Sequence, residues 1–152
     1  MTRVWVDADA CPRPVKDILF RAADRRKVDV ILVANASMAV PRSSRVRSLT
    51  VPHGLDAADD YIVEHSEAGD MVVTQDIPLA AQLVEKGVAV INPRGAELDG
   101  SNIGERLSVR NFMDEMRGAG MQTGGPSAFG ERDKQAFANG FDRVLTRLLQ
   151  QR

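Results

Sequence analysis

Short apolar runs that suit β-strands alternate with helical patterns over the first two thirds of this 152-residue chain. Such runs are typical of strands that are buried on both faces of a sheet. Strands that alternate with helices favour a mainly parallel sheet with helices on both faces, a three-layer α/β sandwich. The predicted strands cover residues 3–6, 28–34, 46–51, 71–74 and 88–91.

Start signals for helices lie between the predicted strands. Pro12 suits the first turn of one helix, and Asp56 is a good N-cap for another. After the fifth strand only helical patterns remain, so we expect one domain over residues 1–152 with a C-terminal helical extension at about 101–150. The glycine-rich stretch 118–130 is longer than most connections, and we expect it to be functional or mobile. The predicted helices cover about residues 12–23, 56–68, 77–86, 103–117 and 132–150.

The order of the strands decides where a ligand would bind. Right-handed crossovers leave few possible topologies. The first strand belongs in the centre because it is apolar and leads into acidic residues. We predict the order 3-2-1-4-5, counting strands along the chain. The order reverses direction between strands one and four, and open α/β sheets bind ligands at such a switch point, beside the carboxyl ends of the strands.

Acidic residues from three segments gather at this predicted carboxyl edge. Asp7 and Asp9 follow the first strand, and Asp76 follows the fourth. Asp59 and Asp60 lie in the first turn of the helix after the third strand, which begins at the same edge. Desolvated carboxylates repel one another unless a cation or a proton compensates them. The three segments together therefore predict a metal site.

Each acid also has a simpler structural explanation. Asp56 can serve only as a helix N-cap, and Asp60 has the character of a solvated acid in a first helical turn. Asp76 can cap the helix that follows it, although its position at a strand end favours a site. For Asp7 a ligand role is favoured over a plain turn. For Asp59 and for Asp9 the two explanations stay equal.

The expected cofactor is Mg²⁺ or Mn²⁺, because carboxylates alone favour a hard cation that keeps part of its water. Zinc is disfavoured because the chain has one cysteine, Cys11, and two histidines, His53 and His65, at spacings that do not suit zinc ligands. A hard cation at this edge can activate a water molecule and stabilise the charge on a phosphate during its displacement.

Basic residues near the same edge are candidate contacts to a nucleic-acid backbone. Arg13 and Lys16 lie in the first turn of the helix that follows the first acids. Arg42, Ser43 and Arg45 lie in the loop after the second strand, which we place at the carboxyl edge. A solvated loop is the competing explanation. The net charge is −1, from 20 basic and 21 acidic residues, so a nucleic acid would have to be held by such a local patch.

Nothing in the sequence marks the chain for export or for a membrane. The first residues lack the basic, apolar and small-residue order of a signal peptide. No apolar run approaches the roughly 20 residues that a membrane helix needs. A single cysteine allows no intrachain disulfide. We expect a cytoplasmic protein without membrane contact.

Long motifs along the chain match those of one known family in order. They are VDADACP at 6–12, VAN at 33–35, LDAADDYI at 55–62, GDMVVTQDIPLA at 69–80, NPRG at 92–95, NIGERL at 102–107 and GGPSAFGERD at 124–133. With them the sequence resembles the YaiI/YqxD family of bacterial proteins over nearly its whole length. That resemblance implies a PIN-like fold. PIN-like nucleases cleave phosphodiester bonds, commonly in RNA, with magnesium or manganese held by acids at the switch point.

The resemblance also implies roles for particular residues. PIN domains usually carry a further glutamate on the helix after the second strand, and residues 35–51 of this chain hold no acid. Asp9 is the candidate substitute, and a site for a single metal is the other option. The acids that match the PIN pattern are Asp7 after the first strand, Asp59 or Asp60 in the helix, and Asp76 in the T-x-D motif.

Three functions stay open at this point. The leading prediction is a nuclease that hydrolyses phosphodiester bonds in RNA or single-stranded nucleic acid. In it Asp7, Asp59 and Asp76 hold the metal, and Asp9 or Asp60 orients the attacking water. The second is a phosphatase of the haloacid-dehalogenase type with Asp7 as the nucleophile. The third is a non-catalytic module that binds metal and nucleic acid.

Overall fold

The protein is described by a computed structural model that covers residues 2–52, 54, 56–118, 120 and 128–151. Its centre is a six-stranded sheet in the order β3-β2-β1-β4-β5-β6. The first five strands are parallel to their neighbours, and β6 is antiparallel to β5. The strands are β1 (Arg3–Asp7), β2 (Asp29–Ala34), β3 (Val46–Thr50), β4 (Met71–Val73), β5 (Ala89–Ile91) and β6 (Glu97–Leu98).

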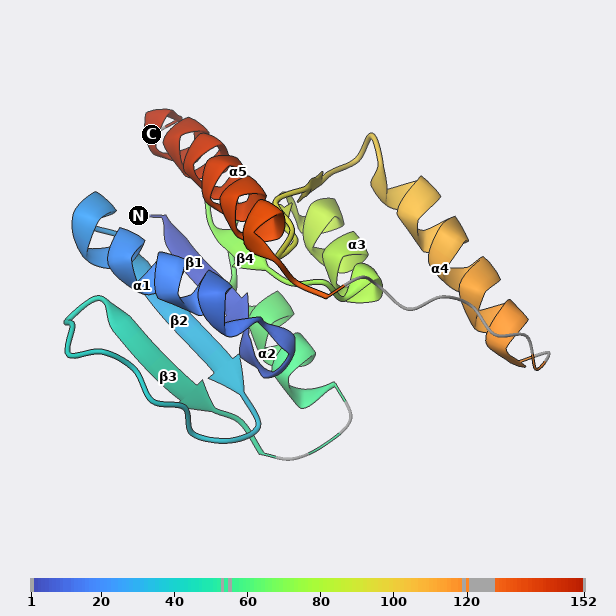
Figure 1. Ribbon diagram of the computed structural model, residues 1–152, viewed down its shortest axis with the longest axis horizontal. Helices are drawn as coiled ribbons and strands as arrows, with labels where there is room; N and C mark the ends of the chain where they lie inside the picture. Colours follow the sequence, from blue (N-terminus) through green and yellow to red (C-terminus); the bar gives the residue numbers. More distant parts are fainter. Residues whose placement is uncertain (1, 53, 55, 119, 121–127, 152) are drawn as a thin grey trace.

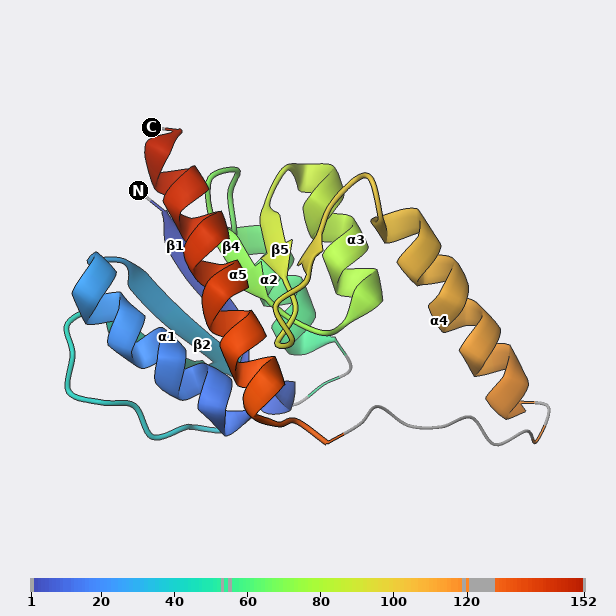
Figure 2. The same ribbon diagram turned by 45° about the horizontal axis from the view of Figure 1, so that its top comes forward.

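Helices cover both faces of this sheet, which makes the three-layer sandwich that the sequence predicted (Figures 1 and 2). α1 and α5 lie side by side on one face, and α2 and α3 lie on the other. α4 packs against α3 and stands apart from the sheet. The helices are the 3₁₀ turn η1 (Ala8–Ala10) and the α-helices α1 (Arg13–Arg26), α2 (Ala57–His65), α3 (Ile77–Lys86), α4 (Ile103–Gly118) and α5 (Glu131–Gln150).

The predicted order of the first five strands is confirmed, with β1 in the centre. Successive side chains of a strand point to opposite faces. On β1, Val4 and Val6 therefore enter the core beneath α1 and α5, and Trp5 enters the core beneath α2 and α3. Both faces of β1 are buried, which is why its sequence is apolar without alternation.

The C-terminal helix α5 belongs to the core. Phe137, Phe141 and Leu145 on one side of α5 are buried in the same cluster as the apolar side chains of α1. At the outer edge of this contact Arg26 of α1 forms an ion pair with Asp142 and donates a 3.0 Å hydrogen bond to the hydroxyl of Thr146. The predicted C-terminal extension thus has two parts, since α5 completes one face and α4 extends the other.

The expectation that no strand follows β5 was wrong. β6 pairs with β5 through Val90 and Ile91. The turn between them is held by the side-chain oxygen of Asn92, which accepts 3.0 Å hydrogen bonds from the backbone N–H groups of Arg94 and Ala96. A strand of two residues is too short to leave a periodic pattern in the sequence.

Two glycines bring this turn against α5. Gly95 has a φ of +93°, and a Cβ at that position would lie 2.3 Å from the carbonyl oxygen of Ala136. A Cβ on Gly140 of α5 would lie 2.4 Å from the carbonyl oxygen of Gly95. The turn and the helix therefore touch backbone to backbone, which explains the glycine in the NPRG motif.

Replacing Gly95 with alanine is expected to lower the free energy of unfolding by about 2 kcal/mol or more, because the new methyl group adds a backbone clash to a left-handed conformation. Urea denaturation measures this change. Gly104→Ala in α4 is the matched control, since among the described residues the added Cβ would meet no atom within 4 Å other than its chain neighbours and the nearby backbone of its own helix. A Gly95 variant as stable as the Gly104 variant would contradict the close approach.

The buried acid Asp70 explains where α2 ends. The residue is 2% exposed, and its carboxylate accepts hydrogen bonds from the backbone N–H groups of Arg3 and Glu67 and from the indole N–H of Trp5. These hydrogen bonds hold the chain after α2 at the amino edge of the sheet, so the helix ends at His65, about three residues before its predicted end. Every donor lies at the amino edge of the sheet, so Asp70 is a structural acid.

The structure also bears on the membrane question. Within the ranges given above, no helix is both long enough and apolar enough to cross a bilayer.

Candidate functional site

One threonine hydroxyl joins the ends of β1 and β4. The pairing of Val6 with Val73 sets Asp7 beside Thr74 at the carboxyl edge. The Thr74 hydroxyl donates a 2.9 Å hydrogen bond to Oδ2 of Asp7 and accepts one of 3.0 Å from the backbone N–H of Asp76. Because Thr74 is buried, it fixes the positions of Asp7, at the end of β1, and Asp76, beyond the end of β4.

Asp76 holds its own helix as well. Its Oδ1 accepts a 3.0 Å hydrogen bond from the backbone N–H of Leu79 and so caps α3, as the structural alternative predicted. The adjacent Gln75 donates a 2.9 Å hydrogen bond to the carbonyl of Ala10 in η1. The segment after β4 is thereby tied both to α3 and to the turn that follows β1.

Asp59 reaches the same edge from the first turn of α2. Burial raises its pKa to about 7, and the charges of Asp76 and Asp7, a hydrogen bond with Asp76 and the charge of Asp56 act in the same direction. A hydrogen bond between two carboxyl groups requires a proton on one of them. Asp59 is therefore an acid that its neighbours hold largely neutral below pH 7.

Asp7 is perturbed by the same surroundings. Burial raises its pKa, the hydrogen bond from Thr74 lowers it, and the charges of Asp76 and Asp9 raise it again. Asp7, Asp59 and Asp76 thus lie near enough to act on one another. In the part of the chain that the structure describes, no three His, Cys, Asp or Glu side chains are already arranged to hold a metal ion. The carboxyl groups are instead engaged with each other and with Thr74.

A cleft of about 280 Å³ opens beside these acids, and Asp60 lines it with Asp59 and Asp76. Asp56 lines it too. Asp56 occupies the predicted N-cap position of α2, but its φ is +62° and its side chain makes no capping hydrogen bond. The interpretation of Asp56 as a simple cap was therefore wrong, because an N-cap residue normally has extended backbone that turns its side chain onto the helix amides. The full lining is Asp56, Asp59, Asp60, Asp76, Pro78, Leu79, Gln82 and Arg110.

Asp9 lies apart from this cleft. Its side chain is exposed, and Oδ2 accepts a 3.1 Å hydrogen bond from the backbone N–H of Asn35, directly after β2. The side-chain oxygen of Asn35 is buried and, within the described residues, has no hydrogen-bond partner. Asp9 thus ties η1 to the end of β2.

Sequence comparison identifies the family of the chain that carries these acids. A family model described as "Uncharacterized BCR, YaiI/YqxD family" matches residues 5–147. The chain belongs to the YaiI/YqxD family. It is 55% identical over 146 residues to a UPF0178 protein of Stutzerimonas stutzeri, covering 96% of this chain and 97% of the relative. It is 56% identical over 143 residues to the UPF0178 protein PC1_0756 of Pectobacterium carotovorum, covering 94% and 95% of the two chains. No solved structure matches the chain significantly.

The YaiI/YqxD chain also brings a basic residue to the cleft that the sequence did not single out. Arg110 of α4 lines the cleft and pairs with Asp114 one turn later at 3.1 Å. Its local sequence shows only an ordinary i, i+4 ion pair. The contact depends on α4 packing against α3, which no pattern near Arg110 reveals.

The candidate nucleic-acid contacts of this family member divide into two groups. Arg13 and Lys16 lie at the start of α1, near the carboxyl edge, and Arg42 is exposed in the connection between β2 and β3. The placement of Ser43 and Arg45 at the carboxyl edge was wrong. The connection must return to the amino edge before a parallel strand can begin. There Ser43 donates a 2.6 Å hydrogen bond to Asp24, and Arg45 pairs with Asp29 at 3.5 Å.

Cys11 and the histidines lie outside the acid cluster. Burial raises the pKa of the Cys11 thiol to about 12, which fits a small packing residue in the core. His65 stacks on Tyr61 at a ring-centroid distance of 3.9 Å near the far end of α2. His53 lies outside the described residues, and so does most of the predicted glycine-rich stretch 118–130.

Proposed function

We propose that this YaiI/YqxD protein is a metal-dependent phosphodiesterase that cleaves RNA or single-stranded nucleic acid, in the manner of PIN-like nucleases. The observation that carries the proposal is the convergence of Asp7, Asp59 and Asp76 at the switch point of a parallel sheet. Packing alone gives no reason to hold three carboxyl groups where each raises the cost of ionising another.

The donor set suits Mg²⁺ or Mn²⁺, since it consists of carboxylate oxygens with no thiolate or imidazole among them. When bound, such an ion lowers the pKa of a water molecule and stabilises charge on a phosphate. Asp59 must release its proton before it can act as a ligand. The Thr74 hydroxyl keeps Asp7 and Asp76 in place when Asp59 loses that proton. A carboxylic acid that shares its proton with a neighbour is a suitable resting state for such a site.

Other residues of the cleft have supporting roles in this proposal. Asp60 lines the cleft and orients the attacking water, whereas Asp9 keeps its oxygen on the backbone of Asn35. Arg110 lines the same cleft and stabilises negative charge on the phosphate that is cleaved. Arg13 and Lys16 bind the strand beyond the cleft.

The first test is cleavage of a fluorescently labelled single-stranded RNA by the purified protein. We expect cleavage in millimolar Mg²⁺ or Mn²⁺, and none when EDTA is in excess. A matched double-stranded RNA measures the preference for single strands. Absence of cleavage of RNA and DNA in both metals would refute the proposal.

The non-catalytic alternative draws on one observation, the lack of an acid in residues 35–51. It predicts that the metal raises the melting temperature while no phosphodiester bond is broken. The phosphatase alternative makes Asp7 a nucleophile. It predicts release of phosphate from a small monoester such as p-nitrophenyl phosphate, at a rate above that of RNA cleavage.

A further inference from the structure

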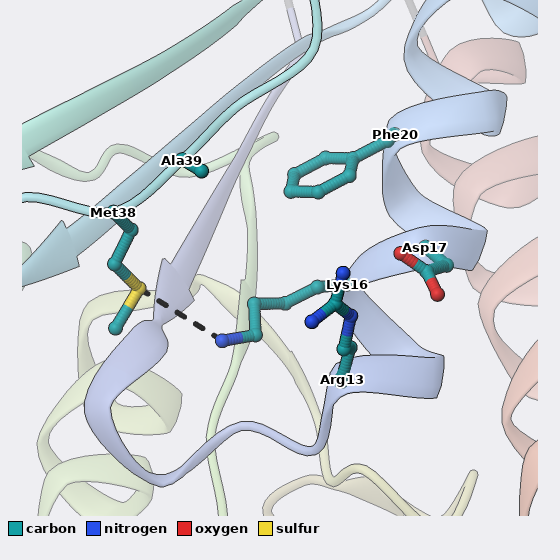
Figure 3. Close-up of a pocket in the computed structure, with 6 residues that line it drawn as sticks. All are labelled: Arg13, Lys16, Asp17, Phe20, Met38 and Ala39. Atoms are coloured by element: carbon teal, nitrogen blue, oxygen red, sulfur yellow. Dashed lines mark hydrogen bonds between the residues drawn. The ribbon is translucent and has the colours of Figure 1, made fainter.

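A second cavity, of about 260 Å³, lies on the α1 face of the sheet. Its walls are the first two turns of α1 and the connection between β2 and β3. In Figure 3 the ring of Phe20 and the side chain of Met38 stand on two sides of the space, and Lys16 extends from α1 toward the sulfur of Met38. The lining residues are Arg13, Lys16, Asp17, Phe20, Met38 and Ala39. The volume lies just below the range of pockets for drug-sized ligands, about 300–1,000 Å³, so one nucleotide unit is a suitable size.

The apolar part of this cavity can take a flat ring. Phe20 and Met38 are only half-buried, and each packs against the core beneath α1. Their other sides line the cavity. An aromatic face and a polarisable thioether are groups on which a nucleobase of any identity can stack.

The charged part of the cavity can take an anion. The Lys16 ammonium contacts the sulfur of Met38 at 3.8 Å. A thioether is a weak acceptor, so an ammonium group with three donors retains hydrogen bonds to offer a phosphate. Arg13 is exposed at the same end of α1 and adds a second positive charge. Asp17 lies on the same wall and offers an acceptor. A ligand that suits all three carries an anionic group and N–H or O–H donors.

This cavity lies close to the acids. The charges of Lys16 and Asp7 both act on the thiol of Cys11, so the two sites flank the short segment between β1 and α1. The backbone of Asn35, at the start of the connection that bears Met38, also touches Asp9. A nucleic-acid strand bound at Asp7 therefore has to pass only this short segment to reach the cavity.

We propose that the cavity binds one nucleotide of the single strand whose backbone continues to the acids. Its base stacks on Phe20 beside Met38, its phosphate contacts Arg13 and Lys16, and Asp17 accepts a hydrogen bond from it. The assignment deepens the proposed function and rests on it, because it takes the bound strand to be the substrate.

The test compares two labelled hexamers of equal charge, hexa-adenylate RNA and an oligomer of six abasic units. Affinities are measured by fluorescence anisotropy in EDTA at low salt. We expect Phe20→Leu to weaken binding of hexa-adenylate about tenfold and to leave the abasic oligomer unchanged, since only stacking is lost. Arg13→Gln is expected to weaken both and to lower the salt dependence by roughly one phosphate contact.

Matched variants control for charge and hydrophobicity. Arg21→Gln removes an exposed charge of α1 outside the cavity, and Phe112→Leu shortens an exposed aromatic side chain of α4. Both are expected to bind hexa-adenylate like wild type. Phe20→Trp should retain binding, and urea denaturation confirms that each variant is folded.

The outcomes separate this cavity from the proposed hydrolysis. Binding of hexa-adenylate that depends on Phe20, in a protein that cleaves nothing, would refute the hydrolysis and support the cavity. The cavity assignment is overturned if wild type does not bind hexa-adenylate, if Phe20→Leu binds it like wild type, or if that variant loses both oligomers equally.

Discussion

Asparagine in place of Asp7 is expected to lower metal-dependent cleavage of single-stranded RNA by at least about a hundredfold. The substitution removes the negative charge from the central strand end, where the proposed ion must be held. An asparagine oxygen can still accept the hydrogen bond that Thr74 donates to Asp7. The fold should therefore survive, and the loss of rate can be attributed to the charge.

The rate is measured with labelled RNA in saturating Mn²⁺. Glu85→Gln provides the matched control, because it removes an exposed carboxylate from α3, the helix that Asp76 caps. We expect that variant to cleave like wild type. An Asp7→Asn protein that cleaves within twofold of wild type would remove Asp7 from the metal site.

Without metal, the contribution of Asp59 to the stability of the protein is expected to fall as the pH rises from about 4 to about 7. Asp59 has a pKa of about 7 in the folded protein, against an ordinary 3.8. The folded state therefore holds a proton that the unfolded state releases above pH 3.8, and it must give up that proton as the pH passes 7. Stability from this group is full below pH 3.8 and is lost through this window. Asp7, whose pKa is also raised, acts in the same direction.

Asp59→Asn isolates this contribution. Urea denaturation in EDTA at several pH values should show a smaller loss of stability between pH 4 and 7 for the variant than for wild type. Acids far from the cleft are unaffected by the substitution, so the difference between the two curves reports Asp59 together with its interactions with Asp76 and Asp7. Parallel curves would show that Asp59 does not hold the extra proton.

Metal should reverse the effect above pH 7. An ion that binds only the folded state at ten times its dissociation constant adds about 1.4 kcal/mol, which corresponds to about 3–6 °C in melting temperature. We expect this shift for wild type in Mg²⁺ or Mn²⁺, a larger shift at higher concentration, and little or none for Asp59→Asn. Calorimetry should also detect release of a proton on binding near pH 7.

The sequence was sufficient for the order of the first five strands and for the placement of Asp7 beside Asp76 at one edge of the sheet. Strands buried on both faces appear in the sequence as apolar runs, and the carboxyl ends of parallel strands lie at one edge of the sheet. The meeting of Asp7 with Asp76 follows from these two facts. The bridge between them, the Thr74 hydroxyl, follows only from the register of β1 against β4.

Features that depend on packing between segments distant in the chain could not be predicted from the sequence. Arg110 enters the cleft because α4 packs against α3. Arg45 leaves the predicted edge because its connection runs back across the sheet. Asp56 is of a residue type that commonly caps helices, but its backbone is left-handed. For Arg45 and Asp56 the local residues fit the expected role and the tertiary arrangement differs, whereas for Arg110 the local sequence indicates no role in the cleft.

The position of α5 has a consequence for synthesis of the protein. Val4 and Val6 of β1 are covered on one face by a helix that leaves the ribosome more than 120 residues later. Until that helix arrives, the nascent sheet shows an apolar surface to the cell. We expect chains cut short before Glu131 to be retained by chaperones or to aggregate, while chains that end after Gln150 fold on release.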